Sequence, residues 1–322
     1  MKVLGRSYDV RSSISHRGRK MFGVRGNHHN LAEYPDRSSG NRFSACNITE
    51  PAPGVFFVEG PASNWILLRQ EEKFTLVDAG YRGDLPLVLG SIRAAGLDPS
   101  GVVAVLVTHA HVDHTGAAAY FSREYGTPVL SSAAEHRHLI GEEKFSVTLP
   151  QVLARAWQPR VFRWAGQALR AGGLKGVQVP QAAVWNDELL AGLPGRPVAV
   201  PTPGHTPGHT AFYLPDAKAV ITGDALVTGH AISPRSGPQL LHAMFHSDGA
   251  GVDTALTVLA RLDARLLLPG HGPALRVAIR DAVDTVRRQR AAKAKPAYVP
   301  GTGWAGEPTY GRVGTAAESS LE

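Results

Sequence analysis

The sequence predicts an α/β fold in which two β-sheets lie inside and helices cover the outside. Short apolar runs of strand length, separated by turns, begin at Val55 and lead into segments with helical spacing. The same order of strands and helices recurs in the second half of the chain, which is the pattern of a layered sandwich. Apolar residues make up 43% of the 322 residues and charged residues 19%, so the chain can bury a sizeable core.

The first half is expected to hold closely spaced strands followed by alternating helices and strands. Turns at Gly60-Pro61 and at 71–73 separate the first three apolar runs. The continuous apolar run that starts at Val102 is typical of a strand covered on both faces. The expected strands are Val55–Val58, Trp65–Leu68, Phe74–Val77, Val102–Val107 and Val129–Leu130, and the expected helices are Leu85–Leu97 and Ala117–Tyr125.

The second half repeats this scheme after an insertion at about residues 142–197. Within the insertion, Trp157, Val161, Trp164 and Leu169 follow helical spacing that is interrupted at Pro159, which favours two short helices. Beyond it, the expected strands are Val198–Val200, Ala211–Leu214, Ala219–Ile221 and Leu266–Leu268, and the expected helices are Asp253–Leu262 and Ala274–Arg290.

The positive charge of the chain lies at its two ends. The formal net charge is +7, of which residues 1–45 carry +6 and residues 287–322 carry +3, so the middle is close to neutral. Both ends lack a sustained apolar period. We therefore expect one domain at residues 46–290, a disordered basic extension at 1–45 and a flexible tail at 291–322. A nucleic-acid partner is not expected, because a folded binding groove would carry its cations on the domain itself.

Cysteine content and hydropathy restrict the class of protein further. Cys46 is the sole cysteine, so an intramolecular disulfide and a thiolate metal cluster are both excluded. No apolar run reaches the roughly 20 residues that a membrane-spanning helix needs. We therefore expect a cytoplasmic protein with a small-molecule substrate and no membrane partner; the oligomeric state stays open.

Three imidazoles and a carboxylate follow the strand predicted at 102–107. The segment Thr108-His109-Ala110-His111-Val112-Asp113-His114 places all four within six residues. Loops at the carboxyl ends of strands are where α/β folds place their sites. His109 and His111 would point to one side of an extended turn, while Asp113 and His114 face a neighbouring position, so two metal ions could share this loop.

Further candidate ligands follow three later strands. Each lies beside a glycine, where the backbone can turn sharply and direct the side chain inward. These motifs are Pro203-Gly204-His205-Thr206-Pro207-Gly208-His209, Thr222-Gly223-Asp224 and Pro269-Gly270-His271-Gly272. After the 109–114 motif, three such motifs in order predict a dinuclear centre.

With these motifs, from about residue 54 to 290, the chain resembles the metallo-β-lactamase superfamily, and the segment Leu76-Val77-Asp78-Ala79-Gly80 is similar to the family's early acidic motif. The resemblance implies a four-layer αββα sandwich. It also implies one zinc ion on His109, His111 and His205 and a second on Asp113, His114 and His271, with Asp224 bridging them. Asp78 and His209 would support the ligands without binding metal. The remaining histidines, 136, 138, 230, 242 and 246, are expected to be surface or structural residues.

Such a centre predicts a hydrolase that cleaves a small ester-, thioester- or lactone-like substrate by attack of a metal-bridging hydroxide. Asp113 would orient the nucleophile and carry its proton. Zn²⁺ is the expected metal, two ions per chain, with iron or manganese as alternatives. Three other functions stay open: an iron-containing oxidoreductase of the same fold, a β-lactam hydrolase and a non-enzymatic binding protein on the same scaffold.

The insertion is expected to cover the active site and to supply the apolar wall of the substrate pocket. Its ends are anchored near the 109–114 and 203–209 motifs, which themselves offer little apolar surface. Under the alternative interpretation, Trp157, Val161, Trp164 and Leu169 simply pack the insertion onto the domain.

Overall fold

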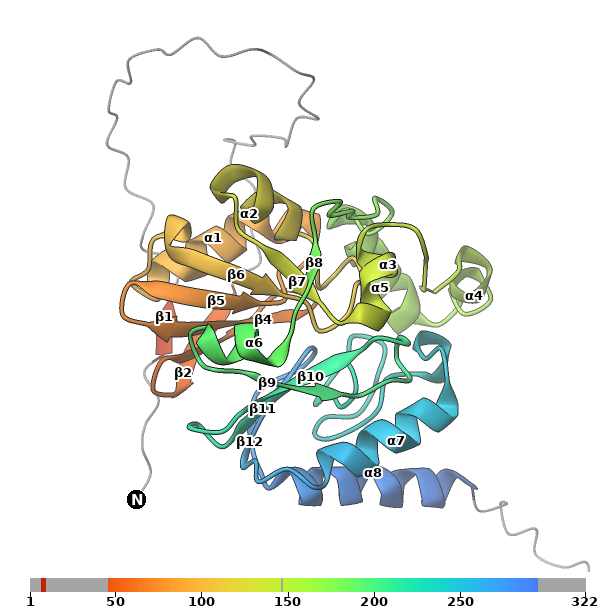
Figure 1. Ribbon diagram of the computed structural model, residues 1–322. Helices are drawn as coiled ribbons and strands as arrows, with labels where there is room; N and C mark the ends of the chain where they lie inside the picture. Colours follow the sequence, from red (N-terminus) through yellow and green to blue (C-terminus); the bar gives the residue numbers. More distant parts are fainter. Residues whose placement is uncertain (1–6, 10–45, 146, 295–322) are drawn as a thin grey trace, which may run out of the picture.

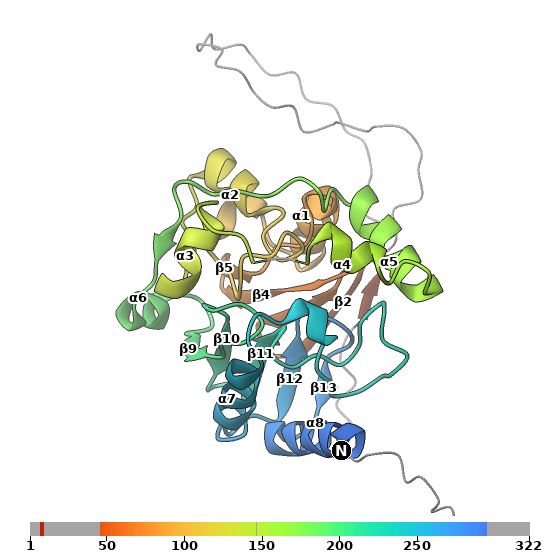
Figure 2. The same cartoon turned by 90° about the vertical axis from the view of Figure 1, so that its right-hand side faces the viewer.

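The computed structural model describes residues 7–9, 46–145 and 147–294 (Figure 1). Among these residues, eight strands form a first sheet in the order β1 to β8, and five form a second sheet in the order β13-β12-β11-β10-β9. The two sheets lie against each other in the middle of the molecule, with α1 and α2 outside the first and α7 and α8 outside the second (Figures 1 and 2).

The bounds of the elements are as follows. The first sheet contains β1 Ser7–Asp9, β2 Asn47–Ala52, β3 Val55–Glu59, β4 Asn64–Gln70, β5 Lys73–Val77, β6 Val102–Leu106, β7 Val129–Ser131 and β8 Ala183–Val184. The second contains β9 Val198–Pro201, β10 Thr210–Leu214, β11 Ala219–Gly223, β12 Leu266–Pro269 and β13 Leu275–Arg276. The helices are α1 Leu85–Ala94, α2 Ala118–Tyr125, α3 Ala133–Leu139, α4 Leu149–Leu153, α5 Pro159–Arg170, α6 Asp187–Gly192, α7 Gly249–Leu259 and α8 Ile279–Ala294.

Three apolar cores separate the four layers, which confirms the predicted sandwich. Strand β3 shows how the sequence builds them: Val55 and Phe57 contribute to the core between the sheets, while Phe56 and Val58 contribute to the core under α1 and α2. This alternation follows from the two-residue period of a strand. The third core joins the second sheet to α7 and α8, with Leu256 and Val283 among its buried residues.

Parallel pairing brings several strand ends to one edge of each sheet. In the first sheet, β5 and β6 run parallel with Val77 opposite Leu106, and β6 pairs in parallel with β7. In the second sheet, β11 and β12 run parallel with Ile221 opposite Leu268. The carboxyl ends of these strands carry Asp78, the 108–114 loop, Asp224 and His271, so the topology places the predicted motifs together.

The structure departs from the sequence-based expectations in a few elements. Within the extension expected to be disordered, Ser7–Asp9 pairs with β2; the rest of residues 1–45 lies outside the described residues. The helix expected at Ala274–Arg290 begins only at Ile279, because Leu275–Arg276 forms β13, and it continues to Ala294. Residues 295–322 also lie outside the described residues. Helix α7 begins at Gly249, because Asp248 accepts hydrogen bonds from the first backbone amides as its N-cap. Within residues 142–197 the structure has α4, α5, β8 and α6.

Each helix among the described residues is too short or too polar to span a membrane.

Candidate metal centre

All seven predicted ligands lie within one cluster, in which His111 and Asp113 are half-buried and the other five are buried. They form three overlapping triads in which the candidate ligand atoms are within 4.8 Å of one another. The triads are His109, His111 and His205; His109, His114 and Asp224; and Asp113, His114 and His271.

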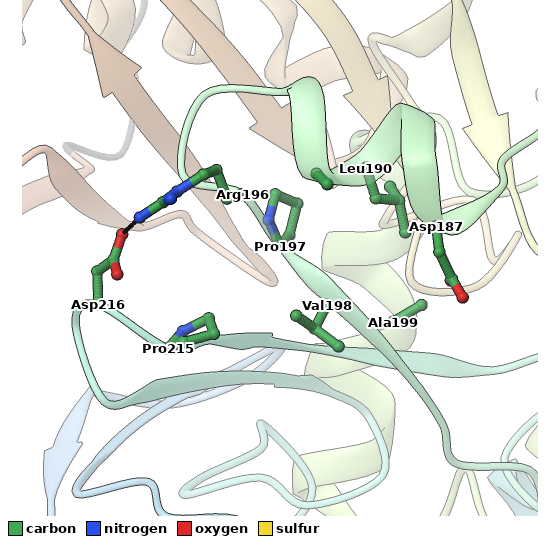
Figure 3. A pocket seen from close by; sticks show the side chains of 9 residues that line it. Asp187, Leu190, Arg196, Pro197, Val198, Ala199, Pro215 and Asp216 are labelled. Carbon is green, nitrogen blue, oxygen red and sulfur yellow. Dashed lines mark hydrogen bonds and ion pairs between the residues drawn. The ribbon is translucent and has the colours of Figure 1, made fainter.

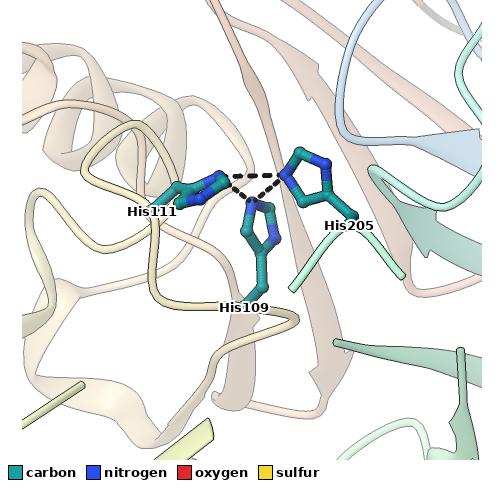
Figure 4. Close-up of side chains that lie close together, drawn as sticks. All are labelled: His109, His111 and His205. Atoms are coloured by element: carbon teal, nitrogen blue, oxygen red, sulfur yellow. Dashed lines mark hydrogen bonds between the residues drawn. The ribbon is translucent and has the colours of Figure 1, made fainter. Parts of the chain in front are cut away.

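The first triad points three ring nitrogens at a common point (Figure 4). His109 Nε2 lies 3.1 Å from His111 Nδ1, and His205 Nε2 lies 3.1 Å and 2.9 Å from those two atoms. Nitrogen ligands at about 2.0–2.1 Å from a tetrahedral zinc ion are separated by about 3.3 Å. The spacing of the three nitrogens therefore fits one such ion.

Neighbouring groups fix which nitrogen of each ring is free. Thr108 Oγ1 donates to Asp78 Oδ2, so it accepts from His109 Nδ1, and the lone pair of His109 Nε2 is left for a ligand. His111 Nε2 donates to the carbonyl oxygen of Phe145, which leaves His111 Nδ1 as the free atom. In both rings the free nitrogen is the one that faces the centre of the triad.

The triad of Asp113, His114 and His271 is arranged in the same way. His114 Nδ1 donates to Asp78 Oδ2 at 2.8 Å, and His271 Nδ1 donates to the carbonyl oxygen of Ala62 at 2.7 Å. The opposite nitrogens, His114 Nε2 and His271 Nε2, lie 3.8 Å and 3.5 Å from Asp113 Oδ2. These three atoms can hold a second ion.

Asp224 lies between the two groups. Its Oδ2 is 3.3 Å from His205 Nε2 and 3.2 Å from His271 Nε2, and its Oδ1 is 3.5 Å from His114 Nε2. A carboxylate in this position can contribute to both ions.

The cluster contains buried polar atoms that the described residues leave without a hydrogen-bond partner. These atoms include His114 Nε2 and Asp224 Oδ1. An unpaired buried polar atom costs about 1–3 kcal/mol, and a metal ion bound here would satisfy both atoms. The residues therefore fit a pair of metal ions.

Burial and neighbouring charges set the protonation of the cluster. Burial, together with repulsion between the rings, holds the pKa values of His109 and His205 well below their usual range, so both are neutral and able to bind metal. Burial alone would lower the pKa of His114, but the carboxylates of Asp224, Asp113 and Asp78 outweigh it and raise this pKa to about 10. The surplus of negative charge around His114 favours a cation there.

Asp78 and His209 take the supporting positions expected of them. Asp78 accepts from the backbone N–H and the hydroxyl of Thr108 and from His114, and it does so from a left-handed backbone conformation with φ of 58°. His209 Nε2 accepts from the backbone N–H of Asp224, and its Nδ1 contacts Thr202 Oγ1 at 2.8 Å. Since both of its nitrogens are engaged, His209 has no lone pair for a metal ion.

Glu135 is a supporting residue that the sequence did not reveal. Its Oε1 accepts from the backbone N–H of Ala110 and from His138 Nδ1, and its Oε2 accepts from Thr206 Oγ1 and the N–H of Gly208. It thereby joins the two ligand loops. No spacing around Glu135 in the sequence marks it, because all its partners except His138 come from distant segments.

Besides His138, whose ring is 5.8 Å from that of His111, two histidines expected to be surface or structural residues lie beside the cluster. The ring of His230 is 4.9 Å from that of His271, and burial lowers its pKa to about 3. The ring of His246 is 5.7 Å from that of His205. Both are on the segment after β11, whose sequence has no ligand-like spacing.

A pocket of about 260 Å³ opens onto the first triad, with His111 and His205 in its wall. The insertion supplies Phe145, Val147 and other residues, and the segment after β11 supplies Met244 and Phe245. The full lining is His111, Lys144, Phe145, Val147, Thr148, Gln151, His205, Met244, Phe245, His246 and Ser247.

The aromatic residues of the insertion take different positions from those expected. Trp157 is 79% exposed, so it neither lines the pocket nor packs on the domain. Trp164 contacts the rings of Phe245 and His230, at 5.4 Å and 6.2 Å, and thus supports the pocket wall from behind. Val161 alone of the four residues is fully buried.

A second hollow, of about 520 Å³, lies between α6, β9 and the turn that joins β10 to β11 (Figure 3). Leu190, Pro197 and Val198 line it, and an ion pair between Arg196 and Asp216 crosses one end. None of the seven candidate ligands lines it, so we assign the chemistry to the smaller pocket.

Comparison with known proteins agrees with the fold and the cluster. The family model described as "Metallo-beta-lactamase superfamily" matches residues 58–271, so the chain belongs to this superfamily. A probable metallo-hydrolase of Bacillus subtilis, YflN, is 25% identical over 240 residues, which cover 70% of this chain and 82% of the relative. A hydroxyacylglutathione hydrolase of Haemophilus influenzae, GloC, is 28% identical over 163 residues, covering 49% and 64%.

Among solved structures, a metallo-beta-lactamase of Cronobacter sakazakii with a HARLDQ motif superposes with a TM-score of 0.52 at 18% identity. The match covers 75% of this chain and 94% of that one. The likeness confirms the fold. Together, the family and the cluster define a metal-dependent hydrolase of this fold with a binuclear His/Asp site.

Proposed function

We propose that the protein is a dinuclear zinc hydrolase that cleaves small ester-, thioester- or lactone-like substrates. The observation that carries this proposal is the position of Asp224 between two triads, one of His109, His111 and His205 and the other of Asp113, His114 and His271. Asp224 Oδ2 lies 3.3 Å from His205 Nε2 in the first and 3.2 Å from His271 Nε2 in the other. Two bound zinc ions would supply an activated water near neutral pH and a Lewis acid for the substrate carbonyl.

Asp113 is the candidate catalytic residue among the ligands. Its side chain is 18% exposed, against 3% for Asp224, so it is the carboxylate that can reach a substrate or a water molecule. Its Oδ2 also lies near His271 and His114. From this position it orients the nucleophile, accepts its proton and passes the proton to the leaving group.

The pocket indicates a small substrate. Its volume of about 260 Å³ is below the roughly 300–1,000 Å³ of typical ligand pockets. Phe145, Val147, Met244 and Phe245 give it an apolar side, while Thr148, Gln151 and Ser247 offer hydrogen bonds. An acyl or aryl group would bind the apolar side, with its carbonyl toward His111 and His205.

A hydrolysis screen with lactones, thioesters, aryl esters and β-lactams tests the proposal. We expect turnover of one of the first three classes by protein that carries two zinc ions, and loss of turnover in Asp113→Asn. Asp263→Asn, which changes a carboxylate at an exposed ion pair with Lys218, is the matched control and should keep full activity. Preferred cleavage of β-lactams would instead support the β-lactam hydrolase. No hydrolysis, with iron near one per chain in protein made without added metal, would support the oxidoreductase.

A further inference from the structure

The outer side of the insertion exposes an unusual amount of apolar surface. Side chains that are 57–79% exposed recur over 26 residues of chain, and we call this set the insertion surface. Its members are Leu149 (65%), Leu153 (63%), Trp157 (79%), Phe162 (68%), Leu169 (57%) and Leu174 (79%). Exposed apolar groups gathered in one region mark a contact surface.

Four of these side chains lie on α4 and α5, while Trp157 and Leu174 lie in the turns that follow the two helices. Leu149 and Leu153 are four residues apart on α4, and Phe162 and Leu169 are seven apart on α5, so each pair shares a face. A different face of α5 carries the buried Val161 and the half-buried Trp164. Both helices lie at the periphery of the molecule, away from the second sheet (Figures 1 and 2).

Basic residues are interspersed in the sequence with the apolar residues of the insertion surface. Residues 144–186 contain six cations and no acidic residue, namely Lys144, Arg155, Arg160, Arg163, Arg170 and Lys175. Within the described part of the chain, none of the six forms an ion pair; Arg155 and Arg160 donate to backbone carbonyl oxygens. Five of the six are exposed.

We propose that the insertion surface docks on an anionic lipid bilayer. A helix with Trp, Phe and Leu beside Arg and Lys lies in the interface between headgroups and acyl chains, where apolar groups enter the bilayer and cations meet anionic headgroups. The expectation of no membrane partner rested on the lack of a spanning run, and interfacial docking needs none.

Charge argues against the other occupants. A second copy that covered the surface symmetrically would bring the same six cations against each other. The basic extension at 1–45, with its charge of +6, would also meet like charge. A nucleic acid would match the cations, but Leu149, Leu153, Leu169 and Leu174 cannot stack on bases as aromatic rings do.

The proposal is independent of the hydrolase reaction, yet the two sites adjoin. The segment that carries Leu149 and Leu153 also carries Val147 and Gln151, which line the pocket at the metal centre. Docking through α4 and α5 would place the mouth of that pocket close to the bilayer surface.

Cosedimentation with vesicles tests the proposal on the full chain. Vesicles of phosphatidylcholine with about one third phosphatidylglycerol should bind the protein at low salt, and neutral phosphatidylcholine vesicles should bind it much more weakly. Two double variants, Trp157→Ser with Phe162→Ser and Arg163→Glu with Arg170→Glu, should each lower the partition coefficient at least tenfold. Their melting temperature and metal content should not change, since the altered side chains are exposed.

A matched control changes the same residue types elsewhere. Val198→Ser with Arg261→Glu alters an exposed apolar residue of β9 and an exposed arginine after α7, and it should bind vesicles like the natural sequence. Equal binding to neutral vesicles, or full binding by both insertion variants, would overturn the proposal; the second result would assign binding to another surface such as the basic tails. A dimer seen by analytical ultracentrifugation that these variants abolish, without vesicle binding, would show that a second copy covers the surface.

Discussion

Replacement of Asp78 by asparagine should remove one metal ion while the fold persists. Asp78 is 1% exposed and accepts three hydrogen bonds, from the N–H of Thr108 at 2.8 Å, from Thr108 Oγ1 at 2.7 Å and from His114 Nδ1 at 2.8 Å. An asparagine oxygen can still accept from the Thr108 N–H, but its NH₂ group would then face the hydroxyl and the imidazole. Donation to His114 Nδ1 would move the ring proton to Nε2, the atom that faces the second ion.

The size of the effect follows from this change of tautomer. Loss of the partner that orients a ligating histidine typically costs 10–100-fold in metal affinity. That range corresponds to about 1.4–2.7 kcal/mol at the second site. The first site should change less, because His111 and His205 have no contact with Asp78 and only His109 is reached through Thr108.

Metal titration against a chromophoric chelator measures both sites separately, and mass spectrometry gives the bound stoichiometry. Asp84→Asn is the matched control: it makes the same change at a buried carboxyl group, 6% exposed, that accepts from the backbone N–H of Tyr81 and contacts no candidate ligand. Unchanged affinity at both sites in Asp78→Asn would refute the tautomer argument. An equal loss at both sites together with a lower melting temperature would show a general structural role instead.

Three further results are expected. Asp113→Asn should abolish turnover with the fold retained, and near-native kcat with both ions bound would contradict its role. Gly270→Ala should displace one metal ion, because a Cβ there would lie 2.3 Å from Asp224 Oδ1; Gly176→Ala, where nothing lies within 4 Å, should bind both ions, and equal metal content in the two would contradict the steric argument. Burial raises the pKa of Asp84 to about 6 and so favours its protonated form in the folded protein. The contribution of this group to the free energy of unfolding is therefore complete below pH 3.8 and is lost as the pH rises through 6. Asp84→Asn should therefore increase the unfolding free energy at pH 8 by on the order of 1–3 kcal/mol and leave it unchanged near pH 3.5, and denaturant melts that differ equally at all pH values would contradict this.

The clustering of the candidate ligands could be predicted because each motif follows an apolar run. A strand that is buried on both faces is visible in the sequence, and the first polar residues after it fall at the sheet edge, as the candidate ligands His109, Asp224 and His271 do. The residues that hold the ligands could not be found in this way. Glu135 lies on α3, a helix that the sequence did not predict, and its hydrogen-bond partners are up to 73 residues away.

The insertion shows the limit of periodicity. Helical spacing predicted the two helices, but it does not tell a face that packs from a face that stays open. Trp157 and Leu169 share their spacing with the buried Val161, yet they are 79% and 57% exposed. Only the tertiary structure distinguishes them, and it also reveals the exposed surface on which the proposed lipid contact depends.

Buried polar residues form hydrogen bonds that connect the candidate ligand loops of the two halves of the fold. Asn64, at the start of β4 in the first sheet, donates to the carbonyl oxygens of Pro269, Gly270 and Gly272, which surround His271 in the second half. Asp78 fixes the 108–114 loop, and Glu135 joins that loop to the 203–209 loop. Because protein hydrogen bonds place the ligands, the entropy of ordering them is lost during folding rather than on binding, which raises metal affinity. The same arrangement explains why replacement of one of these residues should weaken metal binding before it unfolds the protein.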